Sequence, residues 1–150
     1  MRKFFATICA VALFMTGCGE NSQATSAEVK EELPVKNSAT IQIKDKNFSV
    51  TLEDNPSARA FAKMLPLEVE ANELNGNEKY FYLVNDLPNA PVNVRQIHAG
   101  DLMLFGSNCL VIFYKDFSTG SKYTRLGKLN NPVDLEKFLG AGNAHVSFGR

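Results

Sequence analysis

Cysteine is the residue of this 150-residue chain whose chemistry is easiest to place, and it occurs three times. Cys9 lies within an apolar stretch near the start of the chain, and Cys18 follows shortly after that stretch. Cys109 begins a second apolar run over residues 109–114. A thiol reacts as its thiolate, and burial among apolar side chains raises its pKa. Cys109 is therefore predicted to be a buried structural thiol, and Cys18 is the cysteine expected to carry chemistry.

The surroundings of Cys18 follow the plan of a secretory signal. Residues 1–3 carry positive charge and residues 4–15 are almost entirely apolar. This run is shorter than the roughly 20 residues that a membrane-spanning helix needs. Residues 15–18, Met-Thr-Gly-Cys, resemble the lipobox of bacterial lipoprotein signal peptides, although that family usually has Leu where Met stands here. In the family, a diacylglyceryl group is attached to the thiol before cleavage makes the cysteine the new N-terminus.

This resemblance implies three parts. Residues 1–17 would be the lipoprotein signal peptide, Cys18 would carry the lipid, and the polar residues 18–38 would form a tether. The mature protein would be exported and lipid-anchored to a bacterial membrane. Because Gly19, not Asp, follows the cysteine, the resemblance implies the outer membrane, facing the periplasm, in a Gram-negative host. Two alternatives stay open: an ordinary signal peptide cut elsewhere, and an uncleaved membrane anchor.

The elements that must position any site begin at residue 39, where apolar and polar residues start to alternate. Two short helices are expected where Asn55-Pro56 and Asn131-Pro132 place a capping residue before a proline. Many short strands with regular turns predict a mainly β domain over residues 39–150, as a barrel or a sandwich. The expected strands cover residues 41–43, 48–52, 67–71, 78–84, 101–105, 109–114, 123–129 and 145–148.

Several groups of residues in this domain carry a more specific signal through their order and spacing. They are Asn55-Pro56-Ser57-Ala58 with Leu65-Pro66-Leu67, then Glu78-Lys79, Gly100-Asp101-Leu102, Ile112-Phe113-Tyr114 and Leu126-Gly127-Lys128. Together they resemble the bacterial and archaeal cyclophilin-like fold family over nearly all of residues 39–148. The resemblance implies a closed cyclophilin-like β-barrel, of about eight strands, with two short helices as caps.

Cyclophilins themselves are peptidyl-prolyl cis-trans isomerases, and this chain departs from their pattern. Their Phe-His-Arg stretch and Gln-Gly-Asp segment are both missing, and Arg95-Gln-Ile-His98 has related residue types in a different order. No catalytic residue is carried over for this reason. Members of the cyclophilin-like family mostly lack an assigned activity, so whether the chain is an enzyme stays open.

The ligand-binding candidates are side chains that a peptide or prolyl site would use. An isomerase needs an apolar pocket and a donor that stabilises the twisted amide, which lowers a barrier of about 18–20 kcal/mol. Arg125, on a strand with aromatic neighbours, is the first choice of donor and Arg95 the second. The carboxylates of Glu78 and Asp101 could line a ligand pocket. The full set of candidates is Arg125, Glu78, Asp101, Phe113 and Tyr114.

Each candidate also has a purely structural interpretation. Arg125 could be a surface residue paired with Glu78 or Asp116. The carboxylates of Glu78 and Asp101 could cap backbone N–H groups at turns. The aromatic rings, including those of Phe113 and Tyr114, could belong to the core.

Charge and motif content argue against several functions. Lys and Arg number 16 and Asp and Glu number 16, so there is neither a basic nucleic-acid footprint nor an acidic tail. Metal-ligand spacings, phosphate loops and nucleophile elbows are missing, so no metal and no cofactor is expected. We expect a membrane-anchored lipoprotein that binds a peptide or small molecule. The alternatives are a cell-envelope peptidyl-prolyl isomerase and a structural or interaction lipoprotein; the oligomeric state is not predicted.

Overall fold

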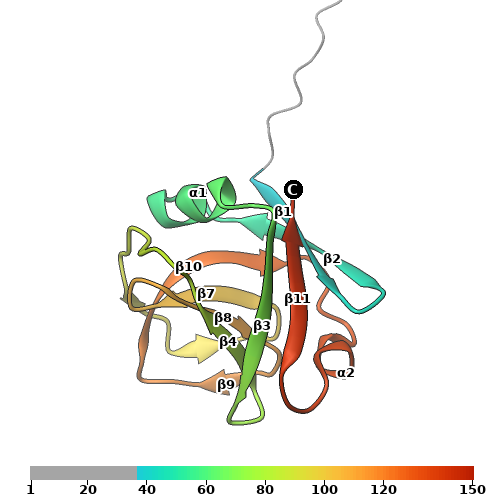
Figure 1. Cartoon of the computed structure of the whole chain (residues 1–150). Helices are drawn as coiled ribbons and strands as arrows, with labels where there is room; N and C mark the ends of the chain where they lie inside the picture. The colour runs from blue at the N-terminus through green and yellow to red at the C-terminus, as the bar shows by residue number, and fades with distance from the viewer. Residues whose placement is uncertain (1–36) are drawn as a thin grey trace, which may run out of the picture. The chain divides into compact units, whose positions relative to one another are not determined.

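The computed structural model describes residues 37–150, which form eleven strands and two helices (Figure 1). The predictions for residues 1–17, for Cys18 and for most of the tether lie outside the described residues. None of the helices in residues 37–150 is long and apolar enough to cross a membrane. The elements are β1 (Ser38–Ile43), β2 (Lys46–Leu52), α1 (Pro56–Lys63), β3 (Leu67–Leu74), β4 (Glu78–Tyr82), β5 (Val92–Asn93), β6 (Gln96–Ile97), β7 (Asp101–Phe105), β8 (Cys109–Phe113), β9 (Phe117–Ser118), β10 (Lys122–Leu129), α2 (Leu135–Leu139) and β11 (Ala144–Gly149).

Eight of these strands close into an antiparallel barrel. Their order is β2-β1-β11-β3-β4-β8-β7-β10, and β10 pairs with β2 to complete the circle. At this seam the chain needs Gly127, because a Cβ atom there would lie 2.6 Å from the carbonyl oxygen of Thr51. The predicted mainly β fold, a closed barrel of eight strands with two short helices, is confirmed.

The hairpins follow from alternation and turn residues. Ile41 of β1 lies opposite Phe48 of β2, and both side chains are buried. Asn75 and Gly76 join β3 to β4 with φ angles of 56° and 68°, in the left-handed region that these two residue types tolerate best. β8 is buried along its whole length between β4 and β7, as its continuous apolar sequence predicts.

The first helix agrees with its prediction. Asn55 Oδ1 accepts a hydrogen bond of 2.8 Å from the backbone N–H of Ala58, and Pro56 is the first helical residue. Phe61 is fully buried, and its ring meets that of Phe148 edge to face with centroids 5.5 Å apart. This packing holds α1 over the end of the barrel at which β1 begins (Figure 1).

The second helix differs from its prediction in where it begins. The Asn131-Pro132 pair does not start it: the backbone N–H of Leu135 first closes a turn on the Pro132 carbonyl at 3.0 Å, and α2 begins at Leu135. Asp134, which precedes the helix, has a φ of 63° and makes no side-chain cap. Leu135 and Leu139 nevertheless point inward as expected.

Apolar side chains pack on both sides of the barrel wall. The interior holds the main core, and a second cluster lies outside the wall around Met103, Val111 and Phe113. The segment from residue 84 to residue 98 and the β9 region cover part of this outer cluster, where β6 pairs with β9 and β5 with β10. These three strands of two residues were not predicted, since two residues are too few to show a period.

Candidate functional site

Successive residues of β4 point to opposite sides of the barrel wall. Lys79 and Phe81 point into the interior, whereas Glu78, Tyr80 and Tyr82 point outward. The outer face of an antiparallel sheet in water usually carries polar side chains. On this section of the barrel it carries aromatic rings and one buried carboxylate.

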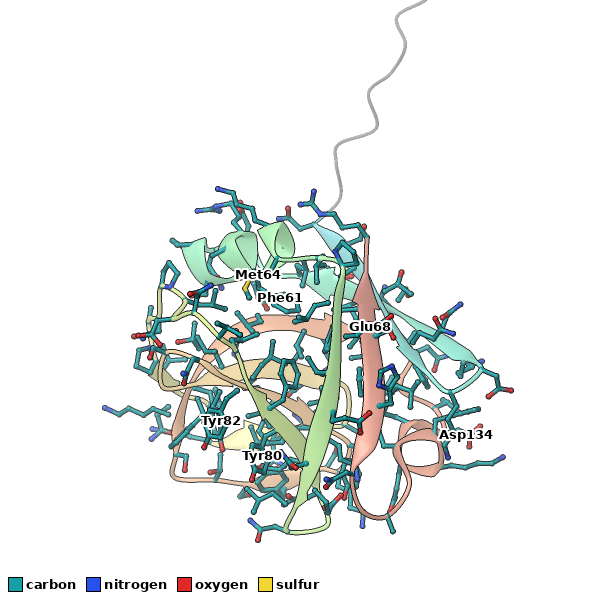
Figure 2. All side chains as sticks on the ribbon, in the orientation of Figure 1. Phe61, Met64, Glu68, Tyr80, Tyr82 and Asp134 are labelled. Atoms are coloured by element: carbon teal, nitrogen blue, oxygen red, sulfur yellow. The ribbon has the colours of Figure 1, made fainter. Side chains whose placement is uncertain are left out.

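Four aromatic residues point outward here, and we call them the outer aromatic strip: Tyr80, Tyr82, Phe105 and Tyr123, of which Tyr123 is buried. Tyr82 lies opposite Cys109, and Cys109 lies opposite Phe105 on its other side. The Phe105 and Tyr123 ring centroids are 5.6 Å apart, and the rings of Tyr80 and Tyr82 meet edge to face at 5.8 Å (Figure 2). Tyr82 is 66% exposed and Phe105 is 51% exposed. Exposed aromatic side chains that gather on one face make a candidate interaction site.

Glu78 stands at one end of this surface. It is 8% exposed, and no residue of 37–150 gives its carboxylate a hydrogen bond or an ion pair. Burial, followed by the negative charge of Glu73, raises the pKa of Glu78. The charge of Glu78 also adds to the effect of burial in raising the pKa values of Cys109 and Tyr123, which lie on the same face. Glu78 therefore does not cap a turn and leaves a carboxylate without a partner beside the strip.

Asp101, in contrast, has the structural role that was its alternative interpretation: its carboxylate caps a turn. Its Oδ2 accepts a hydrogen bond of 2.9 Å from the backbone N–H of His98, and its Oδ1 lies 3.8 Å from Lys128 Nζ. The side chain is buried at the start of β7. Asp101 thus holds the turn that leads into β7, as capping carboxylates commonly do.

Phe113 supports the strip from beneath. The residue is fully buried on the outer side of the wall. The ring of Tyr123 lies edge to face on it at 5.4 Å, and the ring of Phe117 covers it at 5.6 Å. Phe113 fixes the position of Tyr123 and has no surface of its own to offer a ligand.

Arg125 lies on the same outer face, two residues after Tyr123 on β10. Its side chain is exposed and lines a groove of about 290 Å³ between the start of α1, the segment from Pro88 to Val92, and β10. The backbone carbonyl of Arg125 accepts a hydrogen bond of 2.8 Å from Asn55 Nδ2. No ion pair joins Arg125 to Glu78 or Asp116 in the described part of the chain; Asp116 accepts instead from the backbone N–H of Ala99 at 2.7 Å.

Tyr114 lies apart from the other four candidates, inside the barrel. Its hydroxyl donates to both carboxylate oxygens of Glu73, at 2.8 and 2.9 Å. Lys79 is fully buried beside it and donates to Glu73, to the carbonyl of Gly142, and to the carbonyl of Gly140 at 2.9 Å. We call Lys79, Glu73 and Tyr114 the Lys79 cluster. It ties the β3–β4 hairpin to the loop before β11.

The groups of the Lys79 cluster satisfy one another. Burial alone would raise the pKa of Glu73, but the hydrogen bonds from Lys79 and Tyr114 and the charge of Lys79 hold this pKa below its usual value. Burial and the hydrogen bond to Glu73 raise the pKa of Tyr114. Sequence reasoning missed Lys79, although a signal was present: Lys79 falls on the apolar face of its strand, in phase with Phe81 and Leu83.

The prediction that Cys109 is a buried thiol is confirmed. The residue is a free cysteine, 8% exposed, and burial followed by the charge of Glu78 raises its pKa. Within residues 37–150, no three His, Cys, Asp or Glu side chains gather to hold a metal ion. The candidate site consists of the outer aromatic strip, Glu78 and the Arg125 groove.

Comparison with known proteins places this surface on a recognised fold. The model of a family described as the cyclophilin-like family matches residues 41–149. The solution structure of a hypothetical protein from Archaeoglobus fulgidus is similar with a TM-score of 0.54 and 20% sequence identity, over 80% of this chain and 98% of that one. A search of curated proteins gave no match.

Proposed function

The chain belongs to the cyclophilin-like family, and from this premise we propose that it is an exported, lipid-anchored protein whose barrel binds a peptide. The outer aromatic strip is the observation that carries the proposal. An exposed sheet face suits an extended peptide better than a small molecule, because small-molecule sites enclose most of their ligand. Tyr and Phe side chains also contribute large contact areas to interfaces.

The Arg125 groove extends the proposed binding surface. Val92, which lies opposite Tyr123 in the sheet, lines this groove together with Arg125. A peptide that crosses the strip would therefore reach a guanidinium donor and the apolar side chains of Pro56 and Pro88. Arg125 has no ion-pair partner within residues 37–150, so its donors remain free for a peptide carbonyl.

The anchor is supported by the residue pattern at the start of the chain. Cys18 follows a positive segment, an apolar run and a small residue, and a polar segment separates it from the first strand. A lipid on Cys18 would hold the barrel at a membrane surface, and a tether of this kind would leave the strip accessible to exported chains.

Peptide binding is tested by display of a random peptide library against the full chain in detergent. Enriched peptides should lose at least about tenfold in affinity for the double variant Tyr82→Ser/Phe105→Ser. Val133→Ser is the matched control, because Val133 is 65% exposed and lies outside the strip. If the enriched peptides bound the double variant as tightly as the native chain, the binding site would lie elsewhere.

Lipidation is tested by expressing the full chain and its Cys18→Ser variant in a bacterial host with an alkyne-labelled fatty acid. The native chain should take up label and sediment with membranes, and the variant should do neither. Label on the variant would show that Cys18 is not the anchor. Cys109→Ser serves as the matched control and should label like the native chain.

A second candidate function, peptidyl-prolyl isomerisation, is favoured by one observation. Arg125 lines a groove with apolar neighbours, which is the minimum that such an enzyme needs to bind a prolyl ring and stabilise the twisted amide. A protease-coupled isomerisation assay on the full chain decides this point. Turnover that Arg125→Ala abolishes would replace the binding-only function, and an uncatalysed rate would leave peptide binding as the function.

A further inference from the structure

We propose that Glu78, Tyr80 and Tyr82 form a subsite for an arginine side chain of the bound peptide or protein. This inference rests on the proposed function and adds the chemistry of one recognised residue. It starts from the carboxylate of Glu78, a residue that is 8% exposed, which has no partner within residues 37–150 and whose oxygens still reach solvent.

The unpartnered carboxylate calls for a cation that can approach a largely buried residue. Removing a carboxylate from water is unfavourable unless hydrogen bonds and an opposite charge replace the solvent. A guanidinium can supply two parallel N–H donors to the two oxygens, and it is less strongly hydrated than an ammonium group. Arginine therefore suits the carboxylate of Glu78, a residue that is only 8% exposed, better than lysine does.

The two tyrosines that stand two and four residues after Glu78 supply the second half of the subsite. Tyr80 and Tyr82 follow it on the same face of β4, and their rings meet edge to face at 5.8 Å (Figure 2). Tyr80 is half-buried and Tyr82 is 66% exposed, so an incoming planar group can stack on an aromatic ring. Cations are attracted to the faces of aromatic rings, and arginine most often makes this contact.

The same combination is already present on the inner side of β4. There a carboxylate, Glu73, and an aromatic ring, Tyr114, share the cation of Lys79, whose Nζ lies 5.5 Å from the ring centroid. On the outer side the carboxylate and the rings are present, but no Lys or Arg of residues 37–150 pairs with Glu78. The outer set thus lacks the one component that a partner would bring.

Three synthetic peptides test the subsite: acetyl-Gly-Phe-Arg-Phe-Gly-amide and its analogues with citrulline or glutamate in place of arginine. Citrulline keeps the shape of arginine and removes its charge. Titration calorimetry with the full chain in detergent should show arginine bound about tenfold more tightly than citrulline, the size of one charge-assisted contact. Glutamate should bind more weakly than citrulline.

The variant Glu78→Gln should remove the preference for arginine over citrulline. Glu68→Gln is the matched control, because Glu68 is an exposed carboxylate on β3, at a distance from the two tyrosines (Figure 2). Circular dichroism of both variants checks that the barrel is intact. A second variant, Tyr82→Leu, should weaken arginine binding more than citrulline binding.

Three results would overturn the inference. Equal affinity for all three peptides would show that Glu78 recognises no cation, while peptide binding at the strip would stand. Failure of the arginine peptide to bind at about 1 mM would also refute the subsite, and the library experiment above would still judge the proposed function by itself. An arginine preference that survives in Glu78→Gln would assign the recognition to another carboxylate.

Discussion

The two sides of β4 differ in whether the buried charged side chain has a partner. Lys79 and Glu78 are consecutive and both buried. Lys79 points inward and donates to Glu73 and to two backbone carbonyls, so each of its three donors has an acceptor. Glu78 points outward, and its carboxylate has no hydrogen-bond donor or cation within residues 37–150. A charge that the fold satisfies serves the architecture, whereas a charge that the fold buries without a partner costs stability and is a candidate for binding.

Removing the Lys79 side chain from the inner side of β4 should have the largest effect on stability. Lys79→Ala would leave the Glu73 carboxylate and the carbonyls of Gly140 and Gly142 without their shared donor. We expect the free energy of unfolding to fall by about 3 kcal/mol, measured by urea denaturation. The control Lys128→Ala, at an exposed lysine 3.8 Å from Asp101, should change it by less than about 1 kcal/mol. A similar loss in both variants would remove the distinction between the two sides.

A smaller loss is expected when one hydrogen bond of the Lys79 cluster is removed. Tyr114→Phe keeps the ring in the core and deletes the hydroxyl that donates to Glu73. The free energy of unfolding should fall by about 1 kcal/mol. Because Tyr114 is not part of the binding surface, its substitution should leave the peptide affinity unchanged. A loss of peptide binding in this folded variant would contradict its assignment to the architecture.

The smallest change in stability is expected on the outer side, with the opposite sign. The pKa of Glu78 is raised in the folded state, so the folded state holds this proton more tightly than the unfolded state does. Stability from this group is therefore present at low pH and is lost as the pH rises through the raised pKa. Glu78→Gln should raise the melting temperature at pH 7, and the gain should shrink as the pH falls through the raised pKa and be absent below about pH 4.3.

Glu73 provides the internal contrast for that pH series. Its pKa is lowered in the folded state, so its contribution is present above the unfolded pKa and is lost as the pH falls through the folded value. Glu73→Gln should accordingly destabilise the protein at pH 7 and have less effect in acid. The two glutamine variants should therefore move the melting temperature at pH 7 in opposite directions. Shifts of the same sign would refute the comparison.

Local patterns in the sequence predicted most of the fold, because strands and helix starts depend on neighbouring residues. The alternation in β4 already placed Tyr80 and Tyr82 on one face, and Asn55-Pro56 marked the start of α1. The predicted start of α2 was wrong, since a turn that is closed between Pro132 and Leu135 precedes the helix. The short strands β5, β6 and β9 exist only through their pairing with distant segments.

The candidate site was predicted less completely for the same reason. Asp101 and Glu78 both start strands after turns, and the sequence gives them the same two interpretations. Asp101 caps the turn at His98 and Glu78 caps nothing, which depends on where each carboxylate points in three dimensions. Tyr114 was predicted to be an aromatic neighbour of Arg125, yet Tyr114 faces the interior and Arg125 faces outward.

The sequence by itself determined which residues share a face of each strand, because the side-chain period of a strand is a local property. It also carries the pattern at Cys18 from which the anchor is proposed. The tertiary structure alone decided which buried charges are satisfied. The acceptors of Lys79 at Gly140 and Gly142 lie 61 and 63 residues away along the chain. Only the closure of the barrel brings such groups together, and it leaves Glu78 beside Tyr80 and Tyr82 without a cation.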